Sequence, residues 1–243
     1  MIDFGSLVSD SYNRKARLYP AILVIAPIAA AFIAIRPEVI QSNEAWVFAP
    51  IAILGSFLLT QLVRDASKKR EPYLFNSWGG MPSIVVLRHR TNFIDSLSKA
   101  RYHSKLLALV SNTSAVSETQ EAEDPTGADA TYAAWSEFLR NKTRDTKKFR
   151  ILFLENINFG FRRNTWGAKF LGVCSSVVAM VSASLVMWLR FEEVGEVENL
   201  SIGALAVTFF LAVFWVFIVR TDWVKQVAFL YARQLIVSVD ELD

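Results

Sequence analysis

Four long segments without a single charged side chain constrain the fold of this chain more than any other feature. They are residues 18–35, 45–63, 170–189 and 200–219. A helix needs roughly 20 residues to cross the hydrocarbon core of a bilayer, and each segment is close to that length. Hydrophobic residues make up 53% of the chain and charged residues 20%, which also favours lipid over water as the solvent. The sequence therefore predicts a mainly α polytopic membrane protein with four transmembrane helices in two hairpins.

The distribution of lysine and arginine predicts the orientation of these spans. The loops after the first and third spans contain only two of the 26 basic residues, Arg36 and Arg190, but six of the 23 acidic ones. Because basic loops stay in the cytoplasm, both termini and the long middle region are predicted to be cytoplasmic. The first run is longer than the apolar core of a secretory signal, so we expect an uncleaved span. Membrane orientation also explains the net charge of +3, and no nucleic-acid partner is predicted.

The spans divide the chain into four expected parts. In order they are an N-terminal segment with the first hairpin (1–63), a small, mostly helical cytoplasmic domain (64–169), the second hairpin (170–219) and a cytoplasmic C-terminal helix (220–243). Inside the middle domain, composition and periodicity predict four elements. These are a strand over 83–87, a helix from Thr91 or Asn92 to Val110, a mobile acidic loop near 111–130, and a helix from about Asp129 toward Phe153.

A stripe of small residues enters the third span at Ala168, Gly172 and Ser176. Spacing by four places them on one helix face, where small side chains let helices approach closely in lipid. We expect this face to support helix packing and a homo-oligomer. The predicted spans carry no ionisable group, which argues against a proton relay or a voltage sensor.

Both histidines of the chain lie in basic clusters of the middle region. Guanidinium groups bind phosphate oxygens in pairs, and aromatic rings stack on bases, so these clusters predict an anion or nucleotide pocket. Structural salt bridges or contacts with lipid headgroups are the competing interpretation. The candidate pocket residues are Trp78, Arg88, His89, Arg90, Arg101, Tyr102 and His103.

Catalysis and metal binding find no support in the residue pattern. The two histidines lack a matching cysteine or carboxylate set, and the single cysteine, Cys174, lies in an apolar run. The pair Gly79-Gly80 has no P-loop lysine at the required spacing. We therefore expect no catalytic residue, no metal and no cofactor. The basic run beside the second span, residues 64–70, is expected to attract anionic headgroups.

Several segments together resemble a group of uncharacterised bacterial four-span inner-membrane proteins. These segments are RKARLYP (14–20), EPYLF (71–75), WGGMP (78–82), LRHR (87–90), RYH (101–103) and ENINFGFRRN (155–164). The resemblance implies a multi-pass protein of a bacterial inner membrane. It implies no catalytic residue and no particular activity.

These observations lead to two functional hypotheses. The first is a non-enzymatic, oligomeric membrane effector or channel-like protein, gated when its cytoplasmic domain receives an anionic nucleotide or a cytosolic partner protein. This plan is similar to that of the multi-span effectors of bacterial antiviral systems. The alternative is a non-conducting membrane scaffold that recruits a cytosolic partner.

Overall fold

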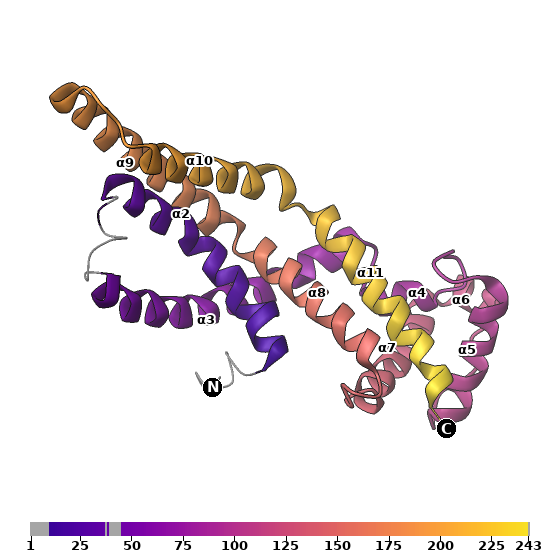
Figure 1. Ribbon diagram of the computed structural model, residues 1–243. Helices are drawn as coiled ribbons and strands as arrows, with labels where there is room; N and C mark the ends of the chain where they lie inside the picture. The colour runs from indigo at the N-terminus through magenta and orange to yellow at the C-terminus, as the bar shows by residue number, and fades with distance from the viewer. Residues whose placement is uncertain (1–9, 37, 39–44, 243) are drawn as a thin grey trace. The chain divides into compact units, whose positions relative to one another are not determined.

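Helices make up all the regular structure in the part of the chain that the computed structural model describes, which is residues 10–36, 38 and 45–242 (Figure 1). The chain divides into two compact units. Unit 1 comprises Met1–Arg70 and Gly160–Val224, and unit 2 comprises Glu71–Phe159 and Lys225–Asp243. Helices α3, α8 and α11 each contribute residues to both units.

The elements follow one another along the chain with short connections. They are η1 (Asn13–Leu18), α2 (Tyr19–Ile35), α3 (Ala45–Ser77), α4 (Pro82–Leu87), α5 (Ser96–Leu109), α6 (Glu118–Glu123), α7 (Pro125–Lys142), α8 (Arg150–Gly167), α9 (Lys169–Val194), α10 (Asn199–Val213), η3 (Phe214–Ile218), α11 (Thr221–Val237) and η4 (Ser238–Glu241).

Among its described residues, unit 1 contains three helices that are long and apolar enough to cross a membrane. They are Asn13–Ile35, Lys169–Glu193 and Asn199–Ile218, and they match the first, third and fourth predicted spans. The fourth ends in the π-helical turn η3. The carbonyls of Val216 in this turn and of Val219, which follows it, accept hydrogen bonds from the Lys169 ammonium at 3.2 and 2.8 Å. The chain is thus a helical membrane protein.

The second predicted span, residues 45–63, falls within the first part of α3. The side chains of residues 45–52 lie outside the described residues. Beyond them, α3 continues without a break past Arg64 to Ser77.

Alanine side chains line the contact among α2, α9 and α10. Ala31 and Ala34 of α2, Ala179 and Ala183 of α9, and Ala204 of α10 form one buried cluster. Because alanine is small, the three helices approach closely, and packing of this kind drives helix association in lipid.

The predicted small-residue stripe borders a second buried cluster of unit 1, to which Ala168 and Trp215 belong. Ala168 and Ser176 are fully buried, and Gly172 faces the fully buried indole ring of Trp215. A Cβ atom on Gly172 would overlap that ring. The close approach of α9 to η3 therefore requires glycine at this position.

Two predictions for the middle region are wrong. The β-branched run 83–87 forms helix α4, which begins at Pro82 in the favourable first position and buries Val85, Val86 and Leu87. Burial of this short apolar run overrides its local preference for a strand.

The predicted mobile loop is also wrong for most of its length, because α6 and the start of α7 occupy it. Ser117 and Gln120 form a reciprocal capping box, and the Asp124 side chain caps the next helix at Gly127. The polar residues that suggested a loop are therefore helix caps.

The other helix boundaries differ from the predicted ones by several residues. Helix α5 starts after Asp95, whose carboxylate caps the Ser98 amide, and the predicted cap at Thr91 or Asn92 is incorrect. The helix expected from Asp129 toward Phe153 is two helices, since α7 ends at Lys142. The predicted C-terminal helix corresponds to α11.

The contact between Gly172 and Trp215 makes a testable prediction. Gly172→Ala should destabilise unit 1 by about 1–3 kcal/mol, because the added methyl group overpacks a buried ring. Gly203→Ala on α10 is the matched control, since a Cβ there meets open space. It should leave the melting temperature in detergent unchanged or slightly raised, because alanine favours helix over glycine. Equal melting temperatures for the two variants would contradict the close contact.

Candidate functional site

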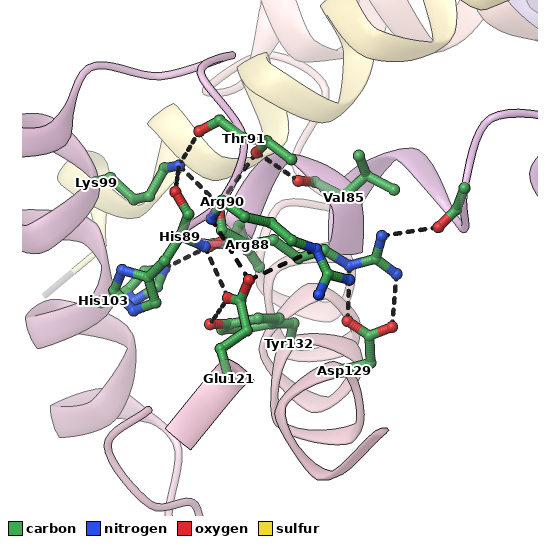
Figure 2. A network of polar contacts seen from close by, with 12 residues as sticks. Val85, Arg88, His89, Arg90, Thr91, Lys99, His103, Glu121, Asp129 and Tyr132 are labelled. Carbon is green, nitrogen blue, oxygen red and sulfur yellow. Dashed lines mark hydrogen bonds and ion pairs between the residues drawn. The ribbon is translucent and has the colours of Figure 1, made fainter. Parts of the chain in front are cut away.

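The densest polar network of unit 2 surrounds the turn between α4 and α5, residues 88–91 (Figure 2). Helices α6 and α7 supply the carboxylates that face this turn, and α5 supplies a lysine and a histidine. The sequence singled out this turn because it carries a basic-histidine cluster.

Arg88 forms a two-point ion pair with Asp129 of α7. Its Nε donates to Oδ1 at 2.8 Å and its Nη2 donates to Oδ2 at 2.6 Å, while Nη1 donates to the Gly79 carbonyl at 2.8 Å. The hydrogen bonds to Asp129 raise the pKa of Arg88. Gly80 has a φ of +136°, and a Cβ there would come within 2.9 Å of the Arg88 guanidinium. Gly80 thus makes room for this arginine.

Glu121 of α6 is a buried carboxylate that accepts hydrogen bonds from several donors. Oε2 accepts from the His89 amide at 2.7 Å and from the Tyr132 hydroxyl at 2.8 Å, and Oε1 accepts from the Arg90 amide at 3.4 Å. Burial opposes ionisation, but these donors outweigh it and lower the pKa of Glu121. Burial and the adjacent carboxylate raise the pKa of Tyr132. Glu121 is therefore ionised and Tyr132 is protonated at neutral pH.

Lys99 of α5 points its ammonium at the backbone of the turn. It donates to the carbonyls of Arg88 at 2.7 Å, His89 at 3.4 Å and Thr91. Burial lowers the pKa of Lys99. The Thr91 hydroxyl donates to the Val85 carbonyl at 2.8 Å. Side chains thus replace the helical hydrogen bonds that this turn lacks.

The two histidines stack edge to face, with ring centroids 4.7 Å apart. His103 Nε2 lies 2.9 Å from the Leu87 carbonyl, and His89 Nε2 lies 2.8 Å from the Val116 carbonyl. A carbonyl can only accept, so each Nε2 carries the proton. Burial, with the nearby His89, lowers the pKa of His103 to about 4. His103 is therefore neutral at physiological pH.

The structure brings together four of the seven candidate pocket residues: Arg88, His89, Arg90 and His103. Arg90 lies 3.8 Å from the same Glu121 carboxylate. In this arrangement the charges of Arg88 and Arg90 face carboxylates of the chain itself. The contacts match the salt bridges of the competing interpretation.

The other three candidates lie elsewhere in unit 2. Arg101 is exposed and pairs with Asp240 at 2.9 Å. Tyr102 is buried, and the buried Trp78 packs against Phe75 and Phe229. Neither aromatic ring is open for stacking on a base.

Sequence reasoning missed the partners of the basic residues: Lys99, Glu121, Asp129 and Tyr132. The capping pattern from Ser117 to Gln120, followed by Asp124-Pro125, is the signal that could have placed α6 and α7 there. With those helices assigned, Glu121 and Asp129 become candidates for pairing with the cationic turn.

Beside the turn is a small pocket of about 220 Å³, lined in part by His89, Lys99 and Glu118. No group of three metal-ligating side chains occurs within the described ranges. The network forms a hydrogen-bonded junction of four helices, in which Asp129 and Glu121 pair with Arg88 and Arg90 while Lys99 binds backbone carbonyls.

These features define the class of the protein: a helical membrane protein with a second helical unit organised around a buried polar network. Comparisons with family models, curated proteins and solved structures find no match to this chain.

Loss of Arg88 should have a large effect on unit 2. Arg88→Ala leaves Asp129 and the Gly79 carbonyl without their donor, and we expect the free energy of unfolding to fall by about 3 kcal/mol. Arg101→Ala removes an exposed pair and should have a much smaller effect, because water screens such pairs. Abundance in the membrane fraction and melting temperature measure both effects. Full abundance of the Arg88→Ala protein would contradict a structural role.

His103 makes unit 2 sensitive to acid. An unfolded histidine titrates near 6.5 and the folded His103 at about 4, so the unfolded state binds more protons between these values. The free energy of unfolding should therefore decrease as the pH falls from 7.5 to 5, by about 2 kcal/mol from this group.

The matched variant for this prediction is His103→Gln, whose amide can donate to the Leu87 carbonyl but does not titrate. Melting temperatures at pH 7.5 and pH 5 should differ less in this variant than in the wild type. An identical pH dependence in both proteins would show that His103 is not the responsible group.

Proposed function

We propose that the protein is a non-enzymatic, oligomeric effector of a bacterial inner membrane, channel-like and gated through its cytoplasmic domain. The observation that carries this proposal is how little of each span is buried. Between 17% and 33% of the candidate span windows are buried within one copy, and the buried contacts among α2, α9 and α10 are filled by alanine. A water path therefore requires several copies, and the exposed apolar faces are available for assembly or for lipid.

Four crossings are part of the proposal. The exposed face of α3 supports a second span, because Ile53, Leu54, Leu58 and Leu62 are 52–62% exposed. Such a row of aliphatic side chains is unfavourable in water but suits lipid. Residues 45–63 also carry no charge.

The proposed orientation places both termini and unit 2 in the cytoplasm. It is supported by the scarcity of lysine and arginine in the two loops that would lie outside, which contain Arg36 and Arg190. An even number of crossings is consistent with both termini on one side.

Gating through unit 2 is supported by the helices that the units share. Helices α3, α8 and α11 contain residues of both, and α8 leads directly into α9. A ligand that changes unit 2 therefore has covalent, helical routes to the spans. The proposed signal is an anionic nucleotide or a cytosolic partner protein, and the proposed setting is antiviral defence, by similarity of plan to multi-span bacterial effectors.

A non-conducting scaffold is the second candidate, and exposed apolar side chains of unit 2 favour it. Leu97 is 84% exposed and Phe93 is 43% exposed, both near the start of α5. Exposed aliphatic and aromatic groups of this kind suit a protein partner.

Reconstitution separates the two candidates. Full-length protein in lipid nanodiscs should contain two or more copies per particle, and in potassium-loaded liposomes it should release the ion when nucleotides or cytosolic extract are added. The release should rise more steeply than linearly with protein density, because several copies form one path. A single copy per nanodisc would contradict the oligomeric effector. Oligomers that stay impermeable with added cytosolic extract would favour the scaffold.

A further inference from the structure

Three arginines gather in unit 1 where three separate elements meet, and the proposed function makes no use of them. They are Arg17 of η1, Arg64 of α3 and Arg163 of α8. Each lies within one helical turn of a buried contact between its element and a neighbour.

The buried contacts fix the elements close together. The Asn164 amide donates to the Ala16 carbonyl at 2.7 Å, and the Ser67 hydroxyl lies 3.3 Å from the Asn164 carbonyl. Ala16, Ser67 and Asn164 are at most 1% exposed. The arginines therefore occupy defined positions around this crossing and are not free ends of a surface helix.

Glycines make the crossing tight. A Cβ on Gly167 would overlap Ser67, and a Cβ on Gly160 would come within 2.9 Å of the Ala16 methyl group. Helix α8 thus presents its backbone to both η1 and α3. This close approach keeps the three arginine-bearing elements together.

Two of the groups that interact electrostatically with Arg17 carry its own positive charge. Arg64 and Arg163 are both close enough to repel it, and Asp10 is the acidic group within range. Arg17 Nη1 donates to the Asn13 side chain at 2.7 Å. Within the described part of the chain, neither Arg17 nor Arg64 has a carboxylate at ion-pair distance.

The Arg64 guanidinium also has a buried hydrogen-bond donor without an acceptor in the part of the chain that the structure describes. Its Nε atom is buried and has no hydrogen-bond partner among the described residues. A buried guanidinium donor without an acceptor is costly, and an oxygen ligand would remove that cost.

We propose that Arg17, Arg64 and Arg163 bind a phosphate group at the end of unit 1 where Asn13 lies. Guanidinium groups pair with phosphate oxygens through two donors each, and an anion also relieves the mutual repulsion. Arg17 belongs to the first turns of a candidate span, and Arg64 follows the charge-free part of α3. Positions at the ends of apolar spans match the depth of the lipid headgroups, so the phosphate belongs to an anionic lipid or to a soluble phosphate compound.

Lipid titration of the full-length protein tests this site. The protein is placed in nanodiscs of phosphatidylcholine, and phosphatidylglycerol is added in one series and inorganic phosphate in another. The melting temperature of the wild type should rise in one series. Arg17→Gln and Arg64→Gln should each weaken the apparent affinity about fivefold.

Lys69→Gln is the matched control, because it removes one exposed charge from the same helix α3. It should weaken binding less than either arginine variant. Melting temperatures in pure phosphatidylcholine show whether each variant folds before ligand is added, and Arg163→Gln provides a third variant if one of the others fails to fold.

A rise with phosphatidylglycerol alone supports a lipid phosphate, and a rise with inorganic phosphate supports a soluble one. No rise in either series would overturn the proposal. An equal loss in Lys69→Gln would also overturn it, because binding would then reflect diffuse surface charge.

Discussion

Hydrocarbon offers no hydrogen-bonding partner, and this constraint accounts for most of unit 1. Its helices satisfy their backbone groups internally, and even the hydroxyls of Thr60, Ser176 and Thr208 donate to carbonyls four residues earlier in the same helix. With backbone groups and these hydroxyls satisfied within each helix, close packing is the main force left to hold the membrane helices together. Small side chains at the contacts among α2, α9 and α10, and the glycine opposite Trp215, supply that packing.

Unit 2 is stabilised in a different way, by pairing buried charges. Asp129 neutralises Arg88, while Glu121 accepts from two backbone amides of the turn and from Tyr132. Lys99 donates to carbonyls on the other side of the same turn. Because each charged group depends on several others, the network is expected to behave cooperatively. A ligand that competes for one carboxylate would therefore alter the whole turn.

Three of the four predicted spans match helices long and apolar enough to cross a membrane, because a charge-free run of bilayer length has few alternative structures. The site was predictable only in part. Arg88 and His89 stood out by residue type, but the ion pair of Arg88 with Asp129 joins positions 41 residues apart, and no local pattern specifies it. The error at residues 83–87 has a similar origin. Their local preference is extended, but burial of the run against the rest of unit 2 stabilises a helix. Glu121 was missed because a polar segment was interpreted as loop when its polar residues were caps.

The π-helical turn at the end of the fourth span has a consequence for helical register. A π turn holds one residue more than an α turn, so its conversion to α would rotate the flanking segments relative to each other by about 100°. Trp215 faces the core in the present register, while Phe217 is exposed. The Lys169 ammonium, bonded to the Val216 and Val219 carbonyls, ties this turn to the start of α9. The Lys169 ammonium and the buried Trp215 ring therefore both fix the rotational setting in which the fourth span meets α9.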